Sequence, residues 1–140
     1  MSDPAAAFHT AQDAALRTSP ELAALFPDGR ARVFGVVPQN APMPFLRIGD
    51  DQVLEDSDEC VSASELFATV HIWTAPEPPD VQLGRRIAGV VRGLLVDLVI
   101  TGFDLVLGEF VEARHLTDPD GSSHAVLVFH YLTTANPETP

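Results

Sequence analysis

The chain has 140 residues, of which 46% are apolar, a size and composition typical of one domain that buries its own core. Its formal net charge is -12, from 20 acidic and 8 basic residues, which disfavours ordinary binding to a nucleic-acid backbone. The one cysteine, Cys60, excludes an internal disulfide and a zinc site built from several cysteines.

No membrane span is predicted. The most apolar part of the chain, residues 87–107, contains one arginine and two aspartates, which a membrane-spanning helix would have to bury. The N-terminus places Asp3 and Asp13 before the first arginine and lacks a continuous apolar segment, unlike a secretory signal. We therefore expect an intracellular protein.

Two helices are predicted at the N-terminus. A capping serine and aspartate precede Pro4, and an alanine-rich segment then continues to Arg17. Ser19 and Pro20 repeat this start, and the second helix should end near Phe26 because a proline, an aspartate and a glycine follow.

A proline-rich corner is predicted to separate two short strands. β-Branched and aromatic residues favour a strand over residues 31–37. Three prolines between positions 38 and 44 then remove backbone donors, which is typical of an exposed or edge segment. The strand over residues 45–49 alternates so that Leu46 and Ile48 are the better core candidates.

Six acidic residues and no basic one lie between Asp50 and Glu59, which predicts a long solvated loop. The segment lacks the glycine and glutamate spacing of a calcium-binding loop. An alternative is that its acids line a passage through which a polyanion slides without adhering. Residues 65–74 then alternate as a strand with bulky side chains on both faces, His71 and Trp73 among them, so both faces are expected to be covered.

Apolar residues recur at helical spacing from Leu83 to Leu98, which predicts the main core helix. Gly89 and Gly93 each lower its stability by about 1 kcal/mol relative to alanine, which suggests close packing against a neighbouring backbone.

Two long strands joined at the sequence DPDG, residues 118–121, are predicted to form a C-terminal β-hairpin with a type I turn and a glycine bulge. The predicted order is two helices, three strands, one helix and this hairpin. It indicates an α+β fold with a mostly antiparallel sheet and helices packed on one face. Residues 1–134 form one predicted domain, and residues 135–140 are a polar tail that we expect to be flexible.

No catalytic or nucleotide-binding motif occurs in the sequence. His115 and His124 flank the hairpin turn beside Asp118, so a metal site or an acid-base cluster is one interpretation. The interpretation that the pattern favours is that these side chains form and solvate the turn. For His71, a packed or interface histidine is favoured over a general base because the sequence identifies no carboxylate partner. The sequence therefore predicts no enzyme, no cofactor and no metal site.

Trp73 and the proline corner are the candidates for an exposed apolar surface. One interpretation is that prolines and charges blunt an edge strand in a monomer. The other is that an identical subunit covers the edge, as in a ring.

Four segments in this order resemble the tail completion, or tail terminator, family of long-tailed bacteriophages, prophages and gene transfer agents. They are residues 33–51, 68–74, 85–95 and 113–132, which read VFGVVPQNAPMPFLRIGDD, ATVHIWT, RRIAGVVRGLL and ARHLTDPDGSSHAVLVFHYL. The most specific piece is the valine-proline-glutamine corner with its two further prolines, followed by a strand that reads His-x-Trp and by the DPDG hairpin.

The resemblance implies a virion protein, assembled in the bacterial host cytoplasm, that forms a ring, commonly a hexamer, on the head-proximal end of a tail tube. There it ends tube growth and binds the tail tube protein and the head-tail connector protein, while DNA passes through its hole without specific binding. The predicted subunit or partner interface comprises Pro38, Gln39, Asn40, Pro42, Pro44, His71 and Trp73. The predicted lining of the DNA passage comprises Asp50, Asp51, Glu55, Asp56, Asp58 and Glu59.

Two alternatives stay open at this point. A head-tail connector or stopper of the neck has the same small size and ring assembly but binds the portal side. A small metal-dependent hydrolase that uses His115, His124 and Asp118 belongs to another class of function. The acidic segment departs from the family pattern, so its role does not carry over residue by residue.

Overall fold

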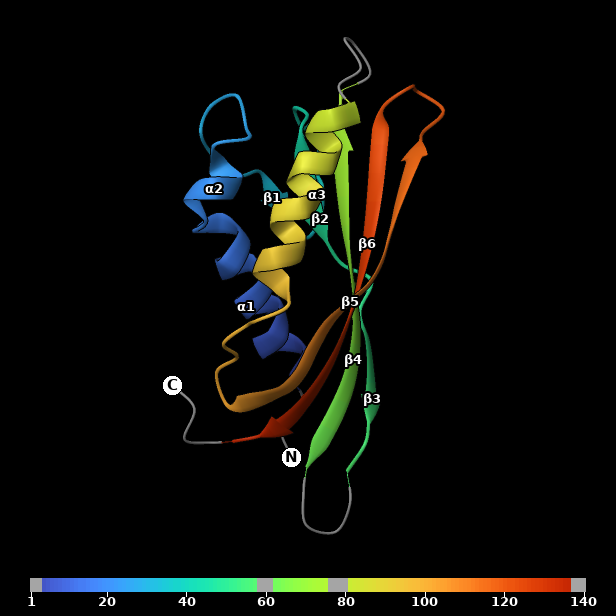
Figure 1. Ribbon diagram of the computed structural model, residues 1–140. Helices are drawn as coiled ribbons and strands as arrows, with labels where there is room; N and C mark the ends of the chain where they lie inside the picture. Colours follow the sequence, from blue (N-terminus) through green and yellow to red (C-terminus); the bar gives the residue numbers. More distant parts are fainter. Residues whose placement is uncertain (1–3, 58–61, 76–80, 137–140) are drawn as a thin grey trace.

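Three helices and six strands make up the part of the chain that the computed structural model describes, residues 4–57, 62–75 and 81–136 (Figure 1). In chain order they are α1 Pro4–Arg17, α2 Pro20–Ala23, β1 Val33–Phe34, β2 Phe45–Ile48, β3 Gln52–Glu55, β4 Ala63–Thr74, α3 Val81–Leu95, β5 Phe103–Thr117 and β6 Ser123–Ala135. This order confirms the predicted α+β class.

The sheet is built around β4 and β6, which pair antiparallel along the whole of β4. The strand order is β1-β2-β4-β6-β5, and β3 pairs with β4 on the same side as β2. β2 lies along residues 70–73 of β4, and β3 lies along residues 64–67. We call these two ends of the sheet the β2 half and the β3 half. Among the described strands, β1 and β2 form the one parallel pair, so the sheet is mostly antiparallel as predicted.

The acidic segment is not the solvated loop that the sequence predicts, because Gln52–Glu55 form β3 and pair with β4. All four side chains of β3 are exposed. The strand therefore needs only backbone hydrogen bonds to β4 and buries no charge, so an acidic pattern does not oppose it. Asp58 and Glu59 lie outside the described residues.

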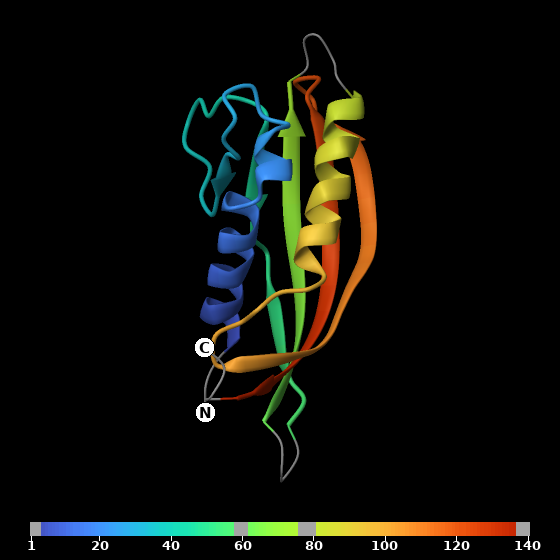
Figure 2. The same ribbon diagram turned by 60° about the vertical axis from the view of Figure 1, so that its left-hand side comes forward.

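The helices lie together on one face of the sheet, as predicted (Figures 1 and 2). On the sheet side of α3, Ile87, Val91 and Leu95 are fully buried. The hydroxyl of Tyr131 on β6 donates a hydrogen bond to the carbonyl oxygen of Leu95, and this bond ties the sheet to the end of the helix. The predicted core candidates of β2, Leu46 and Ile48, are both buried.

The glycines of α3 do not make the close backbone contact that the sequence suggests. A Cβ atom on Gly89 or Gly93 would meet no described atom within 4 Å. The contact is made instead at Gly108 on β5, where a Cβ would clash with the carbonyl oxygen of Val96. Gly108 thus lets β5 pass under the end of α3, whereas Gly89 and Gly93 leave the outer side of the helix open.

The C-terminal hairpin forms as predicted, with β5 and β6 paired from Phe103–Ala135 to Thr117–Ser123. Gly121 has a φ of 88°, the conformation that a glycine bulge requires. Two irregularities in β5, between Leu105 and Leu107 and between Phe110 and Glu112, place one extra residue each on this edge strand. β6 runs to Ala135, one residue past the predicted domain end at 134, and residues 137–140 lie outside the described part.

Candidate functional site

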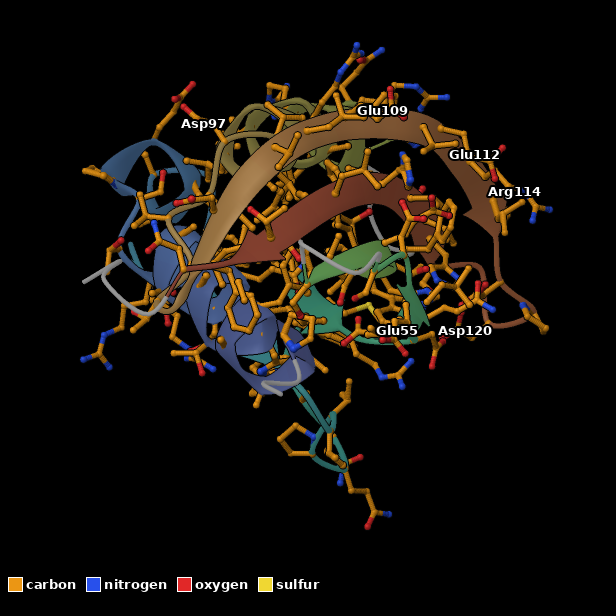
Figure 3. The ribbon with its side chains drawn as sticks, turned by 90° about the horizontal axis from the view of Figure 1, so that it is seen from below. Glu55, Asp97, Glu109, Glu112, Arg114 and Asp120 are labelled. Atoms are coloured by element: carbon orange, nitrogen blue, oxygen red, sulfur yellow. The ribbon has the colours of Figure 1, made fainter. Side chains whose placement is uncertain are left out.

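The proline corner joins β1 to β2 and extends away from the rest of the molecule (Figures 2 and 3). β1 is shorter than the predicted strand over residues 31–37, and Val36, just beyond it, is 88% exposed. Asn40 has a φ of 62°, and the N–H of Ala41 donates to the carbonyl oxygen of Pro38 at 3.2 Å, which closes a turn at the tip. Of the predicted interface residues here, Pro38, Gln39, Asn40 and Pro42 are exposed and Pro44 is buried.

One arginine holds the base of this corner. The Arg32 guanidinium donates to the carbonyl oxygens of Pro42 at 3.4 Å and Pro44 at 3.1 Å. Its other nitrogen lies 3.4 Å from a carboxylate oxygen of Asp28. Proline rings fix φ and the guanidinium fixes the carbonyls, so the corner is a rigid projection with apolar residues at its surface.

A hydrogen-bonded network lies on the face of the sheet opposite the helices, which we call the open face. His71 Nδ1 and His124 Nε2 are 2.9 Å apart, and His124 Nδ1 lies 3.0 Å from Asp118 Oδ1. Trp73 Nε1 donates to Asp118 Oδ2 at 2.9 Å, and its ring stacks on His124 with 4.3 Å between centroids. On the other side, His71 Nε2 lies 3.7 Å from Asp50 Oδ2.

Proton counting shows how far this network is satisfied. The contact between His71 and His124 holds a single proton, because one ring nitrogen must donate and the other must accept. The outer nitrogens face the carboxylates of Asp118 and Asp50, and each contact is favourable only when the nitrogen carries a proton. Two of the three contacts are hydrogen bonds, whereas His71 Nε2, 3.7 Å from Asp50, makes no hydrogen bond within the described residues.

Burial, the charge of His124 and the charge of Arg47, in that order, lower the pKa of His71. Burial therefore favours the neutral form of His71. The network joins β4, β6, the hairpin turn and the β2–β3 corner into one polar surface.

A second histidine on the open face lies between two carboxylates. His130 Nδ1 is 2.7 Å from Glu109 Oε1 on β5, and its Nε2 is 3.5 Å from Glu65 Oε2 on β4. Its ring stacks on Phe67 with 4.7 Å between centroids. The hydrogen bond to Glu109, with a smaller contribution from Glu65, raises the pKa of His130.

The structure does not bring together the three residues of the hydrolase alternative. His124 and Asp118 are in contact, but His115 pairs with Ala125, the neighbour of His124 on β6, so its side chain leaves the sheet on the opposite face. In residues 4–57, 62–75 and 81–136, no group of three or more histidine, cysteine or acidic side chains is placed to hold a metal ion. The alternative lacks the geometry that it requires.

The described acids of the predicted passage lining follow one edge of the sheet. Asp50 lies at the β2–β3 corner, where Arg47 is 3.5 Å away. The pKa of the adjacent Asp51 is raised, mainly by burial. Glu55 and Asp56 are exposed, and Figure 3 shows Glu55 on β3, whereas Glu109 and Glu112 lie along β5 at the other edge.

The sequence profile of the family described as Tail completion protein gp17 matches residues 13–134. The chain belongs to this family. As a tail completion protein, it is a structural component of a phage-type virion and is located in the tail. No curated protein is significantly similar to it in sequence.

A chain from the virion of a native gene transfer agent particle has the same fold as this tail completion protein. The two superpose with a TM-score of 0.81 at 24% sequence identity, over 96% of this chain and 100% of that chain.

In the part of this chain that the structure describes, no helix is long and apolar enough to cross a bilayer.

Sequence reasoning found part of this site. It selected His71, Trp73 and the proline corner and placed His124 near Asp118, but it missed the hydrogen bond from Trp73 to Asp118, the contact between His71 and His124 and the position of His130. These contacts depend on strand register, since His71 and His124 are 53 residues apart. The one available signal was the alternation of side chains along each strand. It places His71 and Trp73 on the same face of β4, and His124 and His130 on the same face of β6.

Proposed function

We propose that this tail completion protein closes the head-proximal end of a tail tube as a ring of identical subunits, commonly six, and joins the tail to the head. The observation that carries the proposal is the family match over residues 13–134. The fold shared with a chain from the virion of a gene transfer agent particle supports it, because the family that the sequence resembles includes gene transfer agents. On this proposal the chain acts by surface contacts and not as an enzyme.

The proline corner is proposed as a contact with another protein of the tail or with the next subunit. It is rigid, it projects, and it holds the most exposed large apolar side chain among the described residues, Val36. Rigid projections bind at a low entropic cost, since little motion is lost on contact. The side chains of His71 and Trp73 are hydrogen-bonded within their own subunit, to His124 and Asp118 respectively. We therefore propose that they stabilise the strand beside this surface and do not themselves contact the partner.

The exposed acids at the end of β3 are proposed to face the DNA passage. Glu55 and Asp56 carry this part of the proposal, while Asp50 interacts with Arg47 and His71 in its own subunit. A lining of the same charge sign as DNA lets the polyanion pass without adhering. The passage needs no specific DNA contact.

A tube assembly assay tests the proposed function. Tail tube protein is polymerised with and without this chain, and tube lengths and end-bound copies are measured by electron microscopy and light scattering. We expect tubes that stop growing and that carry a ring at one end. Continued growth with no end-bound protein would contradict the proposal, and binding to a portal-side connector but not to tubes would favour the neck stopper.

A matched pair of variants tests the role of the corner in the same assay. Val36→Asp places a charge on the exposed corner, whereas Thr10→Asp places one on the exposed side of α1. We expect Val36→Asp to weaken tube capping at least tenfold while Thr10→Asp leaves it unchanged, with both variants unfolding at the wild-type temperature. Equal capping by the two variants would remove the corner from the contact.

A further inference from the structure

The β3 half of the sheet ends in a free edge on each side. There the strand order is β3-β4-β6-β5, and neither β3 nor β5 pairs with a further strand among the described residues. Such edges present unpaired backbone donors and acceptors, which natural proteins cover or blunt. Figure 1 shows β3 and the start of β5 on opposite sides of this part of the sheet.

Exposed apolar residues lie at the same level on both edges. Leu54 on β3 is 43% exposed and Leu107 on β5 is 38% exposed. The register connects them across the sheet through Glu65 of β4 and Leu132 of β6, each of which lies directly opposite its neighbour in this series. Because paired residues share a face, Leu54 and Leu107 are both on the open face. Val53 on β3 and the bulge residue Val106 on β5 are also exposed, at 36% and 63%, although Val53 is level with Gly108.

The strand directions suit a contact between copies. β3 is antiparallel to β4, β4 to β6 and β6 to β5, so β3 and β5 run in opposite directions. A rotation about an axis along the strands keeps these directions in the next copy. β5 of one copy is then antiparallel to β3 of its neighbour, which is the commoner and slightly more stable pairing.

The two edges also carry complementary charges on the helix-covered face. Arg92 of α3 is exposed and lies over the Phe110 ring of β5, 4.2 Å from its centroid. Phe110 lies opposite Phe129 of β6, which lies opposite Ala68 of β4. Because Gln52 of β3 pairs with Phe67, the preceding residue Asp51 is at the level of Ala68 and therefore of Phe110. In addition, α3 and β5 together carry four of the eight basic residues against three acids, Asp104, Glu109 and Glu112, whereas the described residues 50–57 include four acids and no base. A cation on one edge thus lies level with an anion on the other.

We infer that β3 of one subunit pairs antiparallel with the Leu105–Glu109 part of β5 in the next, with Leu54 beside Leu107 and Asp51 facing Arg92. The contact is head-to-tail, so repetition around an axis closes a ring in which the sheets of all subunits are continuous. This inference rests on the proposed ring and names the surfaces that form it.

Cysteine pairing between copies tests the contact directly. In a Cys60→Ser background, Leu54→Cys and Leu107→Cys are made as separate proteins, mixed on tail tubes and oxidised. Cross-strand neighbours are close enough for a disulfide, so we expect a dimer band from the mixture and none from either protein alone. The double variant should give a ladder that ends at the closed ring.

The matched control replaces Leu107→Cys with Leu116→Cys, on the same strand and the same open face but at the level of His124. This pair should cross-link at least tenfold less. A ring that caps tubes but yields no bond between positions 54 and 107 would overturn the inference and leave the proposed function standing. Absence of any ring on tubes, with tube growth unaffected, would overturn both.

Charge reversal gives a second, independent readout. Asp51→Arg should lower ring formation on tubes at least tenfold, and the double variant Asp51→Arg with Arg92→Asp should restore most of it. Failure of the double variant to recover, when it unfolds at the wild-type temperature and the single variant is impaired, would exclude the proposed charge pair.

Discussion

The two faces of β6 show how differently the two sides of this sheet are stabilised. Toward the helices, the strand presents Ala125, Leu127, Phe129, Tyr131 and Thr133, all of which are buried. On the open face, it presents alternating residues that are only half-buried, among them His124 and His130. One face is held by apolar packing under three helices, and the other by hydrogen bonds and ring stacking between side chains.

This difference indicates what each face is available for. The helix-covered face is closed within the subunit by apolar packing, so its centre provides stability and only its margins are left for contacts. The open face is ordered without being covered, because the networks of His124 and His130 hold its side chains in place, and the two free edges are ordered by backbone pairing with β4 and β6. A surface that is ordered before binding loses little entropy when another subunit covers it.

Truncation of neighbouring β6 residues should give the largest contrast between the faces. Leu127→Ala removes a fully buried side chain and should lower the free energy of unfolding by about 3 kcal/mol, within the usual range of about 2–5 kcal/mol for core leucines. Val128→Ala, on the half-buried open face, should cost about 1 kcal/mol. Urea unfolding monitored by Trp73 fluorescence measures both, and equal losses would contradict the contrast.

The two histidines of the open face should respond to pH in opposite directions. Because the pKa of His130 is raised above its ordinary value of 6.5, its contribution to stability is full below that pH and is lost as pH rises through the folded value. Because the pKa of His71 is lowered, its contribution is present above pH 6.5 and is lost as pH falls through the folded value. These effects are smaller than core truncation, about 0.5 kcal/mol for partly exposed groups.

Single replacements separate the two effects. His130→Gln should destabilise the domain more at pH 5.5 than at pH 8, whereas His71→Gln should destabilise it more at pH 8 than at pH 5.5. Unfolding free energies at the two pH values measure the difference, and Val128→Ala, on the same open face and without a titrating group, is the control. The same pH trend in both variants would show that the assigned networks are wrong.

Periodicity and turn chemistry made several elements predictable from the sequence. The helical spacing around Ile87 and Val91, the alternation of β4 and the turn at Gly121 each encode their structure locally. β3 was missed because its stability comes from backbone pairing with a distant strand, while its side chains are all exposed. The acidic residues of this segment indicate that its side chains are solvated, but they do not indicate whether its backbone pairs with another strand.

The candidate site was harder to predict because it depends on register. His115 and His124 both flank the turn, but the pairing His115–Ala125 sends their side chains to opposite faces. A shift of one residue would have reversed that result, because register in a hairpin depends on loop length, and the loop here runs over residues 118–122, one residue beyond DPDG. The contacts of His130 with Glu109 and Glu65 depend on three strands at once, so no local pattern indicates them.

The central claim is that the free edges of the β3 half meet between subunits at the end of a tail. Electron cryomicroscopy of tail tubes assembled with this chain tests it most directly. We expect a closed ring at one end, in which β3 of each subunit lies beside β5 of the next and Leu54 faces Leu107. A ring held together through other surfaces, with β3 and β5 open to solvent, would contradict the claim.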